Sequence, residues 1–100
     1  MARKYEITAI AYNKRGRVVA IGHNSYSKTH PAQARFGRKS GKPNAIFLHA
    51  ELACLLRAKE QVHRLEVFRY DNDGKPVNSK PCPSCQLAIK AYGVKHVKHT

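Results

Sequence analysis

Four segments of the chain carry the apolar and polar patterning of β-strands. Residues 5–12 (YEITAIAY) alternate between polar and apolar side chains, and residues 17–21 (RVVAI) follow a turn at Gly16. These two segments therefore predict an antiparallel hairpin. Residues 64–70 (RLEVFRY) are rich in aromatic and β-branched side chains and predict a third strand. Residues 94–100 alternate again and predict the last strand.

Two segments have the spacing of helices. Residues 49–61 place apolar positions along one side, which predicts the first helix. Its stripe consists of Leu52, Leu55, Leu56 and the stem of Lys59. Residues 83–92 predict the second helix, with Pro83 at a first position that needs no N–H group and Gly93 just beyond the end.

The long connection at 22–44 carries one shorter helical signal. In the stretch THPAQARFG, Thr29 or His30 suits the cap and Pro31 suits the first position of a short helix. Gly37 would end that helix.

The segment after the third strand holds a strong turn signal, DNDGK at 71–75, after which residues 76–80 can run back antiparallel to that strand. The main elements follow the order β-β-α-β-α-β. This order predicts an α/β fold in which helices pack on a single-layer sheet. One hundred residues suffice for one modest core, so we expect a single domain over residues 1–100.

The charge of the chain is extreme, since 19 Lys and Arg residues face six Asp and Glu residues for a net charge of +13. Self-repulsion of that size opposes folding and favours an anionic partner; the alternative is that the charge only aids solubility. No apolar run reaches the roughly 18 residues of a membrane span, and the N-terminus lacks a secretory pattern. We therefore expect a soluble cytoplasmic protein, in a host cell if phage-encoded, with no membrane partner.

Two short motifs bring together the residue types that bind zinc. His49 lies two residues before Glu51 at the start of the first helix, and Pro81-Cys82-Pro83-Ser84-Cys85 opens the second. Imidazole and thiolate are preferred zinc ligands, and a catalytic site keeps its fourth position for water. The spacing of Cys82 and Cys85 at a helix start lets both sulfurs face one point, where the helix dipole favours thiolate. We therefore predict zinc bound by His49, Cys82 and Cys85, with Glu51 as the catalytic proton shuttle.

Other interpretations of these residues stay open at this point. The two cysteines could form a redox pair or half of a structural zinc site, and Glu51 could be a solvated helix residue. Cys54 is interpreted as a small core residue, because free cysteine packs as a hydrophobe and its offset from His49 along the helix suits no shared metal.

The pattern H49-A50-E51 followed by P81-C82-P83-S84-C85 is the signature of zinc base deaminases. The chain resembles the cytidine/deoxycytidylate deaminase superfamily, which includes tRNA adenosine deaminases and small phage-type deoxycytidylate deaminase-like proteins. The resemblance covers nearly the whole chain and implies a cytidine deaminase-like sheet. The expected form is minimal: residues 71–80 are interposed before the cysteines, and the usual C-terminal extension is lacking.

The resemblance also implies substrate contacts. Asn24, after the second strand, would contact the sugar or base, and the backbone N–H of Ala50 would donate to the base carbonyl. His30 lies in the same connection as Asn24 and is a further candidate. The connection carries basic residues expected to rim the pocket and bind phosphate: Arg35, Arg38 and Lys39, together with Lys28 and Lys42.

Three functions remain as hypotheses. The first is a zinc-dependent hydrolytic deaminase that converts cytosine to uracil in a mononucleotide such as deoxycytidylate. The second is a deaminase acting on cytosine, or in second place adenine, in single-stranded DNA or RNA, which the surplus of basic residues favours. The third is a basic nucleic-acid-binding module with structural zinc, which the presence of Glu51 disfavours. Relatives often assemble, so a homo-oligomer is also expected.

Overall fold

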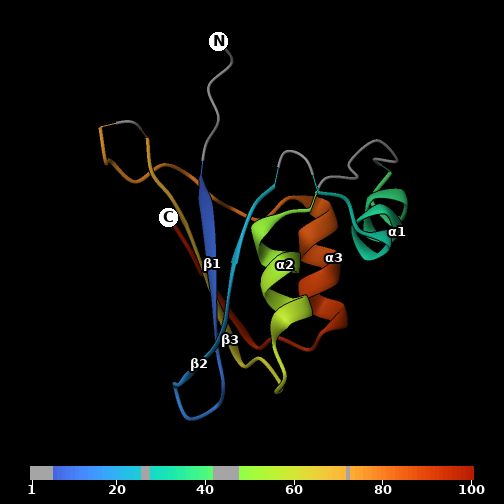
Figure 1. Ribbon diagram of the computed structural model, residues 1–100, viewed down its shortest axis with the longest axis horizontal. Coiled ribbons are helices and arrows are strands. Elements are labelled where there is room, and N and C mark those ends of the chain that lie inside the picture. The colour runs from blue at the N-terminus through green and yellow to red at the C-terminus, as the bar shows by residue number, and fades with distance from the viewer. Residues whose placement is uncertain (1–5, 26–27, 42–47, 72) are drawn as a thin grey trace.

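The computed structural model describes residues 6–25, 28–41, 48–71 and 73–100. Within these ranges four strands form one sheet in the order β2-β1-β3-β4 (Figure 1). Strand β1 pairs antiparallel with β2 and β3, whereas β4 joins β3 in parallel. The strands are β1 (Ile7–Tyr12), β2 (Val18–His23), β3 (Arg64–Arg69) and β4 (His96–His99). The four strands predicted from the sequence are thus confirmed; Tyr5, with which the first was expected to begin, lies outside the described residues.

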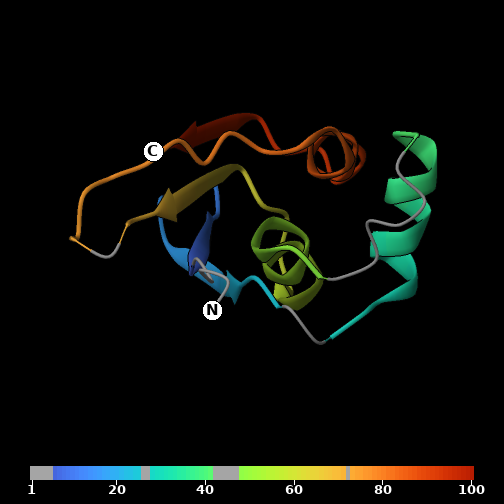
Figure 2. The same ribbon diagram turned by 90° about the horizontal axis from the view of Figure 1, so that it is seen from above.

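Three helices accompany the sheet in the described part of the chain: α1 (Pro31–Lys39), α2 (Ala50–Arg57) and α3 (Pro83–Ala91). Helix α2 packs against β1, β2 and β3, and α3 lies beside α2. Helix α1 is outermost and packs against α3, as both ribbon views show (Figures 1 and 2). The architecture confirms the predicted α/β fold with helices packed on a single sheet. None of these helices is long and apolar enough to cross a membrane.

The helix boundaries correct two details of the sequence analysis. The short helix in the long connection forms, with His30 as its cap, but it continues through the buried Gly37 to Lys39. Helix α2 ends at Arg57 rather than at residue 61, because Ala58 is extended. Its buried side is also wider than the predicted stripe: residues 50–55 are all buried between the sheet and α3, whereas Leu56 is 36% exposed and Lys59 lies beyond the helix.

Small residues on the sheet let α2 approach closely. Ala9 and Ala11 of β1 are fully buried beneath the helix. A Cβ added to Gly22 of β2 would lie 2.6 Å from the carbonyl oxygen of Ala50 and even closer to the backbone nitrogen of Cys54. Backbone therefore packs directly on backbone at this point, and the position of α2 depends on the absence of a side chain at residue 22.

The segment after β3 returns toward the sheet as a tight loop. The Asp71 carboxylate accepts hydrogen bonds from the backbone N–H groups of Asp73 and Lys75. The predicted antiparallel return is confirmed only as a single bridge between Tyr70 and Pro76. Beyond it, Ser79 is buried and bonds to the carbonyl of Val67 and the hydroxyl of Thr100. These bonds hold residues 77–80 against the end of β3.

The packing of Gly22 generates a prediction. Gly22→Ala would force α2 off the sheet, so we expect a loss of about 1–3 kcal/mol in the free energy of unfolding, as for other overpacked cores. Zinc affinity would fall as well, since α2 carries His49. Gly16→Ala is the matched control, because nothing lies within 4 Å of its added Cβ and only its positive φ of 82° is strained. Denaturant unfolding and zinc titration of both variants measure the effects; equal zinc affinity in the two would contradict the assignment.

Candidate metal centre and cavity

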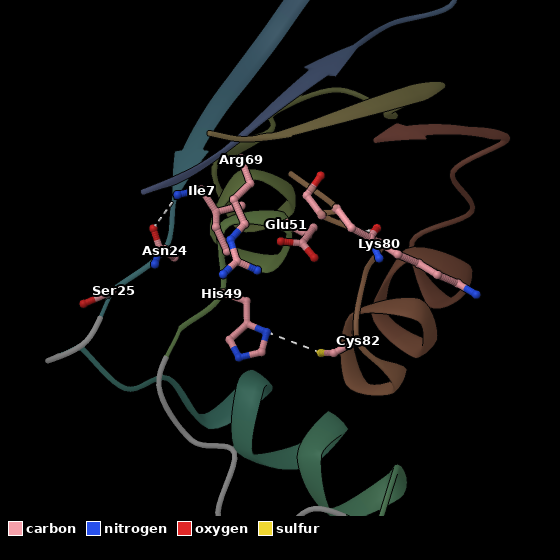
Figure 3. Close-up of a pocket in the computed structure, with 10 residues that line it drawn as sticks. Ile7, Asn24, Ser25, His49, Glu51, Arg69, Lys80 and Cys82 are labelled. Atoms are coloured by element: carbon pink, nitrogen blue, oxygen red, sulfur yellow. Dashed lines mark hydrogen bonds between the residues drawn. The ribbon is translucent and has the colours of Figure 1, made fainter. Parts of the chain in front are cut away.

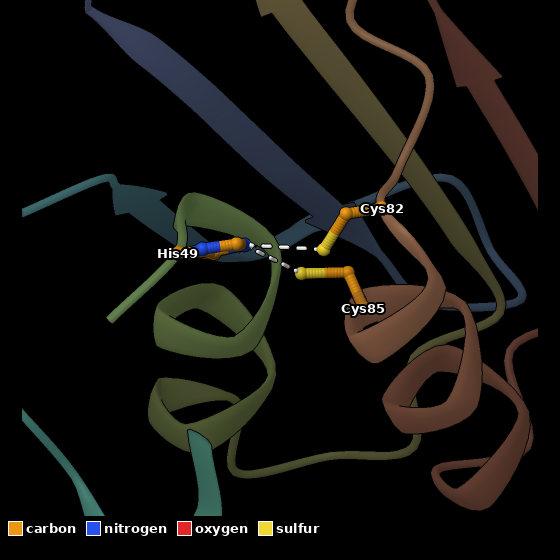
Figure 4. A group of neighbouring side chains, drawn as sticks. All are labelled: His49, Cys82 and Cys85. Atoms are coloured by element: carbon orange, nitrogen blue, oxygen red, sulfur yellow. Dashed lines mark hydrogen bonds between the residues drawn. The ribbon is translucent and has the colours of Figure 1, made fainter. Parts of the chain in front are cut away.

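Three side chains converge where α2 and α3 begin side by side. His49 is the N-cap of α2, Cys82 is the N-cap of α3, and Cys85 lies in the first turn of α3. His49 Nδ1 lies 3.2 Å from Cys85 Sγ and 3.4 Å from Cys82 Sγ (Figure 4). The predicted ligand set is therefore brought together, with all three ligand atoms within 4.8 Å of one another.

The cluster fits zinc in both chemistry and geometry. Zinc ions take thiolate sulfur at about 2.3 Å and imidazole nitrogen at about 2.0–2.1 Å. In a tetrahedral site these lengths put nitrogen and sulfur about 3.6 Å apart, which is close to the two distances at His49 Nδ1. Three ligands from the protein leave one position of a tetrahedron for another group, the arrangement of catalytic rather than structural zinc sites.

The protonation of the cluster also favours a cation. The hydrogen bond from Cys85, aided by His49, lowers the pKa of Cys82 to about 3 against the opposing effect of burial. The bond to Cys82 and burial raise the pKa of Cys85, so the second thiol ionises with much greater difficulty than the first. The bond to Cys82 raises the pKa of His49. A bound metal ion replaces the shared protons and stabilises both thiolates.

Glu51 lies next to the cluster in the first turn of α2. Glu51 as a whole residue is 5% exposed, and burial raises the pKa of its carboxyl group above the ordinary value. It faces the same cavity as His49 and Cys82 (Figure 3). A buried carboxyl group with a raised pKa can accept and return a proton nearer neutral pH than an exposed one can.

Helix α1 supports the cluster from outside, a role that the sequence analysis missed. The side chain of Gln33 is 1% exposed, and its Oε1 accepts a hydrogen bond of 3.2 Å from the backbone N–H of His49. The hydroxyls of Ser40 and Ser84 lie 2.8 Å apart and join the end of α1 to α3. A signal was present in the sequence: Gln33 shares one helix face with Phe36 and Gly37, so it is a polar residue at a buried position.

A cavity of about 380 Å³ opens beside the cluster, within the range of about 300–1,000 Å³ typical of small-molecule sites. His49, Cys82 and Glu51 lie at one side of the cavity, and the rest of its lining comes from the ends of β1, β2 and β3 and from the segment before α3 (Figure 3). The lining residues are Ile7, Asn24, Ser25, His49, Glu51, Arg69, Asn78, Ser79, Lys80 and Cys82.

Of the residues predicted to contact substrate, some line this cavity and others do not. Asn24 lines it, and its Oδ1 accepts a hydrogen bond from the Ile7 N–H at 2.9 Å, so it also ties β2 to β1. Ala50 is the first residue of α2, where N–H groups have no partner within the helix. His30 does not line the cavity; its Nδ1 caps α1 by accepting from the Ala32 N–H at 3.0 Å.

The basic residues predicted to bind phosphate lie elsewhere. Arg35, Arg38 and Lys39 are exposed on α1 and do not line the cavity, and Lys42 lies outside the described residues. The cations that line it, Arg69 and Lys80, were not among the predicted site residues. Proximity in sequence to Asn24 was the reason for choosing α1, but α1 packs on the far side of the helices, against α3.

The third cysteine does not belong to the cluster. Cys54 is fully buried, its Sγ lies 3.5 Å from the carbonyl oxygen of Ala20, and burial raises the pKa of its thiol to about 11. The prediction that it packs in the core is confirmed.

Zinc binding by the cluster can be tested directly. We expect one zinc per chain, and addition of a chelator should lower the melting temperature, because an ion that binds only the folded state stabilises it. Cys82→Ala should abolish stoichiometric zinc, whereas the control Cys54→Ala should retain it despite some loss of packing. Metal analysis and thermal unfolding give both quantities. Zinc retained at full stoichiometry by Cys82→Ala would refute the ligand set.

The role of Gln33 gives a second test. Gln33→Leu removes the acceptor that holds the His49 backbone, so we expect zinc affinity to fall about 10–100-fold, the usual effect of losing a group that orients a ligand. The matched control is Gln61→Leu, since Gln61 bonds to the carbonyl of Tyr92 at the other end of the helices. Competition with a chromophoric chelator measures both affinities. If the two variants lose zinc equally, α1 has no specific role in orienting His49.

Comparison with known proteins agrees with this geometry. Among the solved structures that the chain matches are two with a TM-score of 0.56. One is the dCMP deaminase of the cyanophage S-TIM5, at 26% identity over 93% of this chain and 64% of that one. The other is a mutant cytidine deaminase from Mycobacterium tuberculosis, at 19% identity over 96% of this chain and 68% of that one, a likeness of fold alone. No curated protein matches.

The chain thus spans less than two thirds of the length of the phage enzyme. A family model nevertheless covers almost all of it, from residue 2 to residue 100, including the histidine and both cysteines of the cluster. The chain belongs to the family defined by the cytidine and deoxycytidylate deaminase zinc-binding region.

Proposed function

We propose that the protein is a zinc-dependent hydrolytic deaminase that converts cytosine to uracil in a phosphate-bearing nucleotide such as deoxycytidylate. One observation carries the proposal: His49, Cys82 and Glu51 line a single cavity, with Cys85 completing the ligand set behind them. A structural zinc site needs neither a cavity nor a buried carboxyl group. The arrangement therefore favours an enzyme over a binding module with structural zinc.

The chemistry follows from the zinc ligands and Glu51. His49, Cys82 and Cys85 would hold the zinc ion, which would lower the pKa of water to roughly 7 and so provide hydroxide near neutral pH. Glu51 accepts the proton of the attacking water and passes it to the ring nitrogen next to the reacting carbon. Glu51 then takes the remaining proton from the hydroxyl group added to that carbon and passes it to the exocyclic amine, so that the C–N bond breaks, ammonia leaves and the carbonyl of uracil forms. Water and cytosine are consumed, and uracil and ammonia are formed.

Two observations support a mononucleotide as the substrate. The cavity volume of about 380 Å³ suits a small ligand. The phage relative is named as a dCMP deaminase, and dCMP is a nucleotide of this class. Assembly into a homo-oligomer and a cytoplasmic location stay predictions.

A second candidate function is deamination of cytosine in single-stranded nucleic acid. It is favoured by the exposed cations of α1, Arg35, Arg38 and Lys39, which lie outside the cavity and could follow a phosphate backbone. Adenine is the less favoured base in this case.

The proposal is tested with zinc-loaded protein offered deoxycytidine, deoxycytidylate, cytidylate and a cytosine-containing single strand side by side. We expect uracil from deoxycytidylate. Glu51→Gln should keep zinc and fold but lose about 10²–10⁴-fold in turnover, the usual worth of general acid–base catalysis. Glu60→Gln, an exposed carboxylate beyond the end of α2, is the control. Turnover of none of the four substrates would leave the structural-zinc module as the better account, and near-normal turnover by Glu51→Gln would refute the mechanism.

A further inference from the structure

One arginine reaches the cavity because of the alternation of side chains along β3. Leu65, Val67 and Arg69 point to the same face of the sheet, the face covered by α2. The first two are buried in the core beneath the helix. Arg69 is the next inward position and the last residue of the strand, and it lines the same cavity as the residues at the start of α2. Its guanidinium group therefore extends beside the start of the helix, toward His49 and Glu51 (Figure 3).

The backbone at Arg69 is held from both sides. Its N–H donates to the hydroxyl of Thr100 at 3.1 Å, and its carbonyl accepts from the N–H of Val77 at 2.9 Å. It also pairs across the sheet with Ile7, whose own N–H bonds to Asn24. The interposed segment, far from being a loose insertion, thus fixes the strand end from which the arginine projects.

Lys80, the other cation of the lining, is placed differently. Its backbone borders the cavity, but its side chain points away from His49 and Glu51 (Figure 3). Among the described residues, Arg69 is therefore the cation whose charged group is directed into the cavity. Arginine stays charged at all physiological pH values and offers a planar fork of donors that matches two oxygens of a phosphate.

We propose that Arg69 is the specificity-determining residue of the cavity and binds the phosphate of the nucleotide whose base lies at Glu51. This inference rests on the proposed deaminase function and identifies the feature that distinguishes its substrate from a nucleoside. The terminal phosphate of a mononucleotide carries a charge of about −1.5 to −2 at pH 7, more than a backbone phosphodiester. A single arginine in a confined cavity therefore favours the mononucleotide over an internal nucleotide of a strand.

The test separates binding from turnover. Calorimetry on zinc-loaded Glu51→Gln protein, which does not consume the ligand, compares deoxycytidylate with deoxycytidine. We expect Arg69→Gln in that background to weaken deoxycytidylate binding about 10–100-fold, the worth of a charge-assisted hydrogen bond, and to leave deoxycytidine within about twofold of the parent. Arg69→Lys should fall between, since it keeps the charge and loses the fork. Arg17→Gln, in the exposed turn between β1 and β2, removes one charge elsewhere and should change neither ligand.

Zinc content and melting temperature are measured on each variant, so that a folding defect is recognised. Should Arg69→Gln weaken both ligands equally, the arginine would orient Glu51 or the base, and the phosphate assignment would be wrong. If a cytosine-containing strand binds more tightly than deoxycytidylate and Arg69→Gln weakens it with a steep salt dependence, the phosphate is that of a polynucleotide and the mononucleotide assignment falls. Turnover is measured separately on protein that keeps Glu51. If the Arg69→Gln variant of that protein still forms uracil from deoxycytidine, the deaminase function stands even if the phosphate assignment fails.

Discussion

The contact of α2 with the sheet at Gly22 is the constraint on which the site depends. His49 is the N-cap of α2 and Glu51 lies in its first turn, whereas the two cysteines lie at the start of a separate helix packed beside it. The Nδ1–Sγ distances of 3.2 and 3.4 Å exist only if both helices begin at the same level. A backbone-on-backbone contact is the tightest available, because it leaves no flexible side chain to absorb a shift.

Support for the cluster comes in successive layers outward from the sheet. Gln33 of α1 holds the His49 backbone, and the Ser40–Ser84 contact joins α1 to the helix that carries the cysteines. On the other side, Thr100 joins β3 to residues 77–79, which precede Cys82 in the chain. Hydrogen bonds from buried polar groups, Gln33, Ser79 and Ser84, thus help to position the ligands. Burying a polar group costs free energy unless the group has a hydrogen-bond partner, so the same hydrogen bonds stabilise the fold and position the site.

The sequence predicted the parts of this structure that depend on local signals. Strand alternation, the helix starts at Pro31 and Pro83, and each of the two zinc motifs depend on residues within a few positions of one another. What could not be predicted depends on contacts distant in sequence. The early end of α2 and its wide buried side follow from packing against both the sheet and α3. The cavity cation was missed for the same reason: strand register puts Arg69 beside residues 18 and 20 positions earlier, at Glu51 and His49.

The basic residues predicted to bind phosphate and the arginine that lines the cavity carry their positive charges in two different settings. Arg35, Arg38 and Lys39 lie on an exposed helix, where water and salt screen each charge within a Debye length of about 8 Å at physiological ionic strength. Charges in such positions raise the rate at which an anion arrives, and they discriminate weakly between anions. Arg69 is partly buried, held by its backbone, and shares a confined cavity with Glu51. A cation in that setting is screened less and acts on a ligand of fixed orientation. On the proposed function, the net charge of +13 would account for attraction to phosphate in general, whereas selection among phosphate-bearing substrates would fall to Arg69, which the sheet directs inward.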